Sequence, residues 1–127
     1  MSLLGATEIR ELAAKLDLNP SKGLGQNFVI DGNVCQRIVR QVSIAPSDVA
    51  LEIGPGLGSL TLAILETSAP LIAVEIDSRL AKQLPETVKS HNSNADLTVV
   101  NQDALNVTQL PKDPTDRKST RLNSSHI

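Results

Sequence analysis

The 127-residue chain has almost no aromatic residues: Phe28 is the only one, and neither tryptophan nor tyrosine occurs. Its hydrophobic residues, 40% of the total, are therefore mainly aliphatic, and they suffice for the core of one modest domain rather than two. The single cysteine, Cys35, excludes an internal disulfide and favours a reducing compartment. We interpret Cys35 as a residue on the face of a helix.

Long apolar runs and signal sequences are also lacking. No run reaches the length of a membrane-spanning helix, and the first residues do not combine a basic segment with an apolar one. The two histidines, His91 and His126, stand apart from each other and from other metal-ligand residues, so the sequence offers no metal site. We therefore expect a cytoplasmic protein with no membrane segment and no bound metal.

The chain also lacks a large excess of positive or negative charge. The formal net charge is −2, which argues against a general nucleic-acid clamp. Residues 1–45 contain five basic and four acidic residues, whereas residues 46–115 contain four basic and nine acidic ones. The basic residues of the amino-terminal part are compatible with contacts to phosphate, but a solvated surface is the interpretation that we favour.

The residue pattern divides the chain into three parts. Residues 1–45 are expected to form an amino-terminal helical arm, and residues 46–113 a partial Rossmann-like domain. Residues 114–127 have no apolar periodicity and predict a disordered tail. These last residues also resemble the translation of a synthetic sequencing-adapter oligonucleotide. We therefore interpret them as an artefact of a gene fragment and assign them no function.

Capping residues indicate two helices in the arm. Thr7 is expected to cap the first helix, whose apolar residues recur at helical spacing before Asn19 and Pro20. Asp31 or Asn33 is expected to cap the second helix. The arm is thus predicted to contain two short helices joined by a glycine-containing loop.

Three apolar runs in the second part predict parallel strands, which are expected to cover residues 49–53, 71–76 and 97–101. Helices are expected between them at 59–66 and 78–90, the latter with a break or restart at Pro85. Right-handed crossovers place the strands in the order third, second, first. This arrangement is the first half of a doubly wound α/β sheet, and it leaves the far edge of the first strand unpaired.

A βαβ unit with a glycine-rich turn carries most of the functional information. Three glycines follow the first strand: Gly54, Gly56 and Gly58. The second apolar run ends at Glu75, about 20 residues after Gly54, which is the spacing of nucleotide-binding βαβ units. Glycines allow the main chain to approach a ligand, and a carboxylate at the carboxyl edge of a parallel sheet can bind a ribose diol.

The same residues distinguish two kinds of adenosine cofactor. The dinucleotide fingerprint requires a third small residue at the position of Ser59, and an acid such as Glu52 before the turn would repel a pyrophosphate. An acid before three alternating glycines instead favours S-adenosylmethionine. Turn chemistry alone remains an alternative for the glycines. Asp103, just after the third strand, is interpreted as a ligand of adenine, as a cap of a short helix, or as both.

Four segments together resemble the ribosomal RNA adenine dimethyltransferase family: residues 22–28, 52–61, 74–77 and 102–105. The resemblance implies a class I (Rossmann-like) methyltransferase fold that uses S-adenosyl-L-methionine. It further implies dimethylation of adenine N6 in small-subunit ribosomal RNA during ribosome biogenesis. Leu57 favours this branch, because related macrolide-resistance enzymes usually have a lysine there.

The resemblance also implies the roles of individual residues. Asn27 and the main chain at Val29 would contact the amino-acid end of the cofactor, and Gly54 would lie against it. Glu75 would bind the ribose hydroxyls, and Asp103 the adenine amine. Supporting roles fall to three further residues, Glu52, Gly56 and Gly58.

The catalytic motif of the family, Asn-Leu/Ile-Pro followed by Tyr or Phe, does not occur in this sequence. Residues 83–85 and 109–111 echo it without the asparagine or the aromatic residue. We therefore expect no catalytic residue in this chain and no turnover. The intact protein is expected to be a monomer that acts on ribosomal RNA in the pre-ribosomal small subunit. A non-catalytic nucleic-acid-binding or assembly factor and a nicotinamide-dependent oxidoreductase half-domain remain as alternatives.

Overall fold

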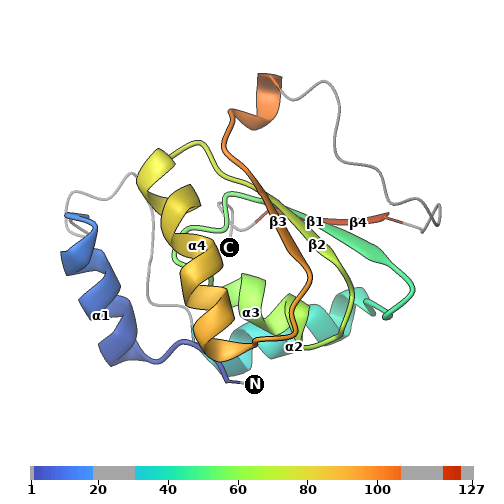
Figure 1. Cartoon of the computed structure of the whole chain (residues 1–127). Helices are drawn as coiled ribbons and strands as arrows, with labels where there is room; N and C mark the ends of the chain where they lie inside the picture. The colour runs from blue at the N-terminus through green and yellow to red at the C-terminus, as the bar shows by residue number, and fades with distance from the viewer. Residues whose placement is uncertain (1, 19–30, 107–118, 124–127) are drawn as a thin grey trace.

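The computed structural model describes residues 2–18, 31–106 and 119–123. The helices are α1 (Ala6–Lys15), α2 (Gly32–Val42), α3 (Ser59–Leu65), α4 (Ser78–His91) and the short 3-10 helix η2 (Ala104–Asn106). The strands are β1 (Val49–Ile53), β2 (Leu71–Val74), β3 (Leu97–Val100) and β4 (Ser119–Asn123). Helices and strands alternate from β1 to β3, as the sequence predicts (Figure 1).

The four strands are parallel and lie in the order β3-β2-β1-β4. The predicted order of the first three strands is confirmed, and β1 has the predicted bounds. β2 and β3 end earlier than expected, at Val74 and Val100. After β2, Glu75 and the residues that follow it form a turn in which the side chains of Glu75 and Asn101 bind main-chain groups.

The strand β4 corrects two expectations. Residues 114–127 were expected to be disordered and the far edge of β1 unpaired, but residues 119–123 pair with β1 from Val49↔Ser119 to Ile53↔Asn123. An exposed strand edge offers N–H and C=O groups that pair with any extended segment, so side-chain polarity did not reveal this strand. In doubly wound sheets the fourth strand also lies beside the first. The sheet therefore extends beyond residue 113.

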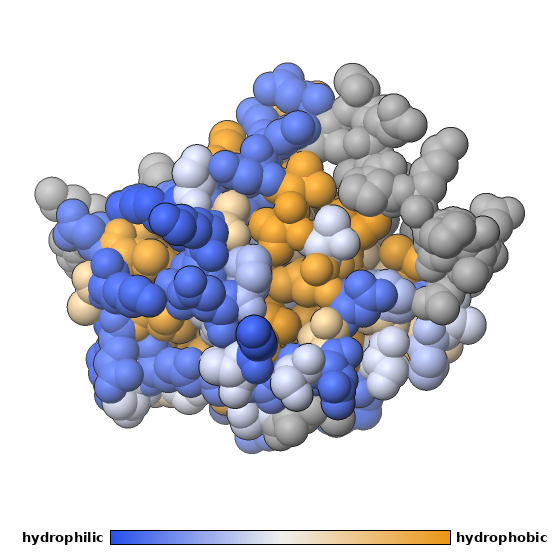
Figure 2. Space-filling model, viewed as in Figure 1, coloured by the Kyte–Doolittle hydropathy of each residue, from blue (hydrophilic) through white to orange (hydrophobic). Residues whose placement is uncertain are grey.

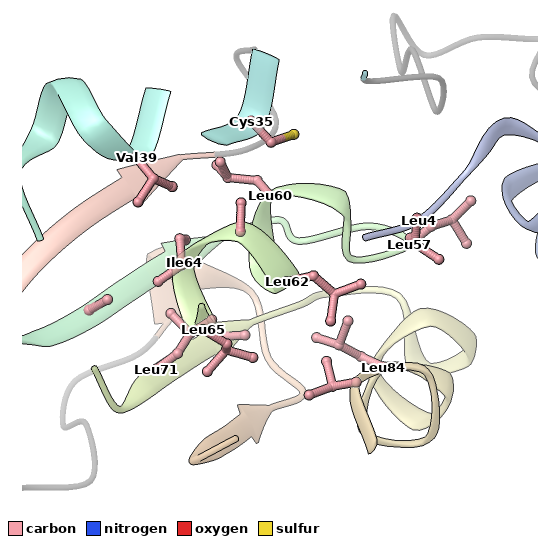
Figure 3. Packing of buried hydrophobic residues seen from close by; sticks show 14 of the residues in the cluster. Leu4, Cys35, Val39, Leu57, Leu60, Leu62, Ile64, Leu65, Leu71 and Leu84 are labelled. Carbon is pink, nitrogen blue, oxygen red and sulfur yellow. The ribbon is translucent and has the colours of Figure 1, made fainter. Parts of the chain in front are cut away.

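Helix α3 is the centre of the core. All seven of its residues are buried, so other parts of the protein cover it on every side rather than on one face. Figure 1 shows α2, α3 and α4 on one side of the sheet, and Figure 3 shows Leu60, Leu62 and Ile64 of α3 pointing toward different neighbours. A helix of this length is not stable alone, so packing in the core stabilises it and positions its amino terminus.

Figure 2 shows hydrophobic residues gathered over the strands, while hydrophilic residues cover most of the visible surface of α1 and α4. Among the residues that the structure describes, no helix is long and apolar enough to span a membrane.

The helix caps agree with the sequence in one case and differ in the other. Asp31 caps α2, since its side chain accepts a hydrogen bond from the main-chain N of Asn33 at 2.8 Å. The prediction for α1 is wrong: Gly5 is the N-cap, and Thr7 lies inside the helix, where its hydroxyl accepts from Arg10 at 3.4 Å.

Helix α4 is continuous through Pro85, where a break or restart was expected. An internal proline removes one helical hydrogen bond and costs about 3 kcal/mol. Leu80, Leu84 and Val88 recur every fourth residue around Pro85, and all three are buried in the core. Their packing on both sides of the proline outweighs the local preference.

Cys35 is completely buried on α2, as a helix-face residue would be, and burial together with the nearby carboxylate of Glu52 raises the pKa of its thiol to about 11. At pH 8 such a thiol is about 0.1% thiolate, against about a quarter for a free cysteine. We expect a thiol-reactive disulfide reagent to label Cys35 at least about 100-fold more slowly in the native protein than in denaturant. Equal rates measured by absorbance would contradict this burial.

Candidate cofactor site

The glycine turn between β1 and α3 requires its glycines for different reasons. Gly54, Gly56 and Gly58 have φ values of 69°, 60° and 106°, in the left-handed region that other residues rarely adopt. A Cβ atom at Gly58 would lie only 2.9 Å from Leu84 Cδ1, whereas nothing lies within 4 Å of one at Gly56. Gly58 thus allows α3 and α4 to pack closely, and the main chain at Gly56 faces open space.

Glu75 lies where β2 ends, and its side chain is only 5% exposed. One carboxylate oxygen, Oε1, accepts from the main-chain N of Gly56 at 3.1 Å, and Oε2 accepts from that of Asp77 at 3.0 Å. Glu75, the residue predicted to bind the ribose, thus lies beside the predicted glycine turn. A carboxylate has about four acceptor positions, so two main-chain bonds leave capacity for two hydroxyl groups.

Asn101 stabilises the turn that carries Glu75, a role that the sequence did not indicate. Its side-chain Nδ2 donates to the main-chain oxygens of Glu75 at 2.9 Å and Ile76 at 3.3 Å. Its Oδ1 accepts from Ser78 Oγ at 3.0 Å. An amide residue directly after an apolar strand was the available signal, because such a residue lies at the carboxyl edge of the sheet.

Asp103 caps the helix η2. Its Oδ1 accepts from the main-chain N of Leu105 at 3.0 Å, and its main-chain oxygen accepts from Asn106 at 2.9 Å. The capping interpretation is therefore confirmed, and it does not exclude a role toward a ligand. Asp103 follows β3 at the same edge of the sheet as Glu75 follows β2.

Two large apolar side chains near these acids are exposed. Ile76, directly after Glu75, is 66% exposed, and Leu105, two residues after Asp103, is 92% exposed. Both residues follow strands of the sheet closely, so each lies near its acid at the carboxyl edge. The sequence analysis overlooked both residues, although their positions next to the acids could have identified them.

Glu52 is completely buried and accepts a hydrogen bond from Thr61 Oγ1 at 2.6 Å. This bond joins β1 to α3 just behind the glycine turn. A structural role for Glu52 is thus established, and the expected role toward the charges of a ligand stays a prediction. Asn27 and Val29, as well as Phe28, lie outside the described residues.

Asp77 and Arg79 form an ion pair where the Glu75 turn enters α4. Arg79 Nη2 lies 3.0 Å from Asp77 Oδ2, and Nη1 donates to the main-chain oxygen of Leu16 at 2.9 Å. The hydrogen bond from Arg79 and its positive charge lower the pKa of the Asp77 carboxyl below its usual value of 3.8. The sequence analysis assigned no role to either residue.

His91 does not stand alone, contrary to the sequence analysis. Its Nε2 lies 2.8 Å from Glu8 Oε1, and its Nδ1 contacts the hydroxyl of Ser2. These contacts join the carboxyl end of α4 to the amino-terminal residues. Across the described side chains, no three His, Cys, Asp or Glu residues lie close enough to bind a metal ion together.

The sequence model of the ribosomal RNA adenine dimethylase family matches residues 18–125. The chain belongs to this family. It is 53% identical over 116 residues to ribosomal RNA small subunit methyltransferase A of Leifsonia xyli subsp. xyli, covering 90% of this chain and 41% of the relative. The chain therefore spans less than half the length of that relative. The family match extends past residue 113, into the segment interpreted as an artefact, and that interpretation stays a hypothesis.

Solved structures confirm the class I methyltransferase fold. The crystal structure of the 23S rRNA methyltransferase ErmE superposes with a TM-score of 0.57 at 35% identity, covering 68% of this chain and 34% of ErmE. A dimethyladenosine transferase from Plasmodium falciparum gives a TM-score of 0.56 at 30% identity, covering 65% of this chain and 29% of that one. The described sheet thus shares its fold with part of each of these two methyltransferases.

Proposed function

We propose that the intact protein transfers methyl groups from S-adenosyl-L-methionine to adenine N6 of small-subunit ribosomal RNA, and that this chain carries its donor-binding half. One observation carries the proposal: the buried carboxylate of Glu75 accepts a hydrogen bond from the main-chain N–H of Gly56. Gly56 itself borders open space at the carboxyl edge of the sheet. Membership of the ribosomal RNA adenine dimethylase family supports the substrate.

The ribose and the adenine of the donor each have a candidate binding group at this edge. The carboxylate of Glu75 would accept hydrogen bonds from the two ribose hydroxyls, and that of Asp103 would accept from the adenine amine. The exposed side chains of Ile76 and Leu105 would cover the two faces of the adenine ring, which would bury apolar surface. Gly54 would provide close main-chain approach.

The position of Glu75 also argues against a dinucleotide. In dinucleotide-binding folds the N–H groups of the glycine turn and the following helix bind the pyrophosphate. In this chain the N–H of Gly56 donates to a carboxylate, which would repel a phosphate at that place. S-adenosylmethionine has no phosphate, and its sulfonium and ammonium groups are positive, so the same carboxylates favour it.

The chemistry of the reaction requires mainly positioning. When bound, S-adenosylmethionine supplies a methyl group on a positively charged sulfur, which an amine nitrogen can attack in line. The residues of this chain would orient the nucleoside through Glu75 and Asp103, and so direct the methyl group toward the target base. The groups that bind the target adenine belong to the family motif that this sequence lacks, so we predict no turnover by this chain alone.

Isothermal titration calorimetry with S-adenosylhomocysteine and with NAD tests the proposal. We expect saturable heat with S-adenosylhomocysteine and none with NAD. Binding of NAD alone would support a nicotinamide-dependent oxidoreductase half-domain. Binding of neither ligand, combined with RNA binding that a Glu75→Ala substitution leaves unchanged, would support a non-catalytic RNA-binding or assembly factor.

A further inference from the structure

The side chain of Asn101, the first residue after β3, continues the pairing between β2 and β3 beyond the strands themselves. The main-chain N of Glu75, one residue past β2, donates to the main-chain oxygen of Val100 at 2.9 Å. Hydrogen bonds of a parallel ladder alternate in direction, so the next one would run from the main-chain N of Gln102 to the oxygen of Glu75. That oxygen accepts at 2.9 Å from Asn101 Nδ2, a side-chain donor.

A side-chain donor at this point allows the two chains to separate without losing the bond. Figure 1 shows that the chain turns toward α4 after β2, whereas after β3 it continues to η2, drawn in orange. Asp103, which caps η2, lies two residues after Asn101. Asn101 therefore joins the segment with Glu75 to the segment with Asp103 where these segments leave the sheet.

The partners of Asn101 determine the orientation of its amide. Nδ2 also donates to the main-chain oxygen of Ile76 at 3.3 Å, and Oδ1 accepts from Ser78 Oγ at 3.0 Å. Carbonyl oxygens only accept hydrogen bonds, so the NH₂ group has to face the oxygens of Glu75 and Ile76. The contact thus requires the N–H groups of an amide and not only a side chain of this size.

The main chain and the side chain of Glu75 are held by different groups. Its carboxylate accepts from the main-chain N–H groups of Gly56 and Asp77 at 3.1 and 3.0 Å. Its main-chain oxygen accepts from Asn101. A ligand-binding group is most effective when its support fixes it before the ligand arrives, and Asn101 provides this support from behind the turn.

We propose that Asn101 is a positioning residue for the ribose: it fixes the main chain of Glu75, so that the carboxylate already lies where two ribose hydroxyls can donate to it. This inference rests on the proposed function, which assigns Glu75 to the ribose. Asn101 acts through Glu75 and needs no contact with the ligand. Its loss should therefore weaken recognition of the ribose hydroxyls more than recognition of the rest of the nucleoside.

Two uncharged nucleosides isolate the contribution of these hydroxyls. Adenosine carries both of them and 2′,3′-dideoxyadenosine carries neither, so the ratio of their Kd values measures the preference. We expect a preference of about 100-fold in the unmodified protein and a reduction of about 5-fold in Asn101→Ala. The reduction is moderate because Asn101 is exposed and water can replace part of its hydrogen bonding. A general loss of stability would weaken both nucleosides alike and leave the ratio unchanged.

Three further variants identify the group that matters. Asn101→Asp keeps the size but presents oxygen to the main-chain oxygens of Glu75 and Ile76, so the preference should fall at least as far as in Asn101→Ala. Its added charge affects both uncharged nucleosides alike. Ser78→Ala removes only the donor to Oδ1 and should reduce the preference less than about 2-fold. Asn94→Ala, at an exposed asparagine before β3, is the matched control and should leave the preference unchanged.

Hydrogen exchange provides a second readout that needs no ligand. The amides that donate to the carboxylate of Glu75 are those of Gly56 and Asp77. Asn101→Ala should speed exchange at both amides at least about 3-fold, because a less restrained Glu75 breaks these bonds more often. Asn94→Ala should leave both rates unchanged.

The possible results are distinguishable. A reduced preference for adenosine together with faster exchange supports the inference. If the unmodified protein prefers adenosine and Asn101→Ala prefers it equally, the inference is overturned and the proposed function stands. Unchanged exchange at Gly56 and Asp77 in Asn101→Ala overturns the inference whatever the ligands do. If the unmodified protein shows no preference for adenosine, the ribose role of Glu75 in the proposed function fails, and the inference fails with it.

Discussion

Replacing Glu75 with alanine is expected to raise the Kd for S-adenosylhomocysteine at least about 100-fold, which corresponds to about 2.8 kcal/mol. Two hydrogen bonds from the ribose to a carboxylate contribute about 1.5–3 kcal/mol each. The low exposure of this side chain, 5%, excludes water from it and keeps these bonds from being weakened. Calorimetry on the purified variant measures the change.

A control substitution at another acid separates the loss of a ligand contact from the loss of one negative charge. Glu11→Gln removes one negative charge from the exposed surface of α1 and should leave the affinity within about 2-fold, since exposed charges interact weakly. Glu75→Gln should still bind poorly, because an amide has only one acceptor oxygen and cannot accept from the N–H groups of both Gly56 and Asp77. An affinity of Glu75→Ala within about 3-fold of the unmodified protein, at unchanged Tm, would refute the ribose role.

The second large effect is on stability: Gly58→Ala is expected to lower the free energy of unfolding by about 2–5 kcal/mol. A side chain at Gly58 would be strained at a φ of 106°, and its Cβ would lie 2.9 Å from Leu84 Cδ1. Leu84 is only 1% exposed and is packed in the core, so it has little room to move. Urea denaturation followed by circular dichroism measures the loss.

Gly56→Ala is the matched control in the same turn. Gly56 also has a positive φ, but a Cβ there meets nothing within 4 Å, so the stability loss should be about 1–2 kcal/mol. The added methyl group would instead occupy the open space assigned to the ligand. We therefore expect Gly56→Ala to weaken S-adenosylhomocysteine binding more than Gly58→Ala does, once both are measured as folded proteins. Equal stability losses would contradict the proposed difference between the two glycines.

Local sequence patterns were sufficient wherever a residue acts within its own segment. The bounds of β1, the glycine-rich turn and the cap at Asp31, one of two predicted candidates, all follow from neighbours a few residues away. The predictions failed where distant packing dominates. Pro85 lies inside a continuous helix because Leu84 and Val88 are buried on either side of it, and no local rule contains that information.

The strand β4 illustrates a different limit. Its sequence is polar, and its pairing with β1 depends on main-chain groups that every residue possesses. Polarity patterns report the burial of side chains and not the availability of a strand edge. The strand can therefore be recognised only from its pairing with β1, and not from the sequence pattern of residues 119–123.

By itself the sequence determined the class of fold and led to the proposed ligand, because apolar strands, a glycine-rich turn and a strand-terminal acid are each encoded locally. Only the tertiary structure decided how these parts meet. It placed Glu75 on the N–H of Gly56, Asn101 behind the same turn, and Arg79 between that turn and α1. Such contacts join residues 19 to 63 positions apart, and their geometry depends on the packing of the whole core.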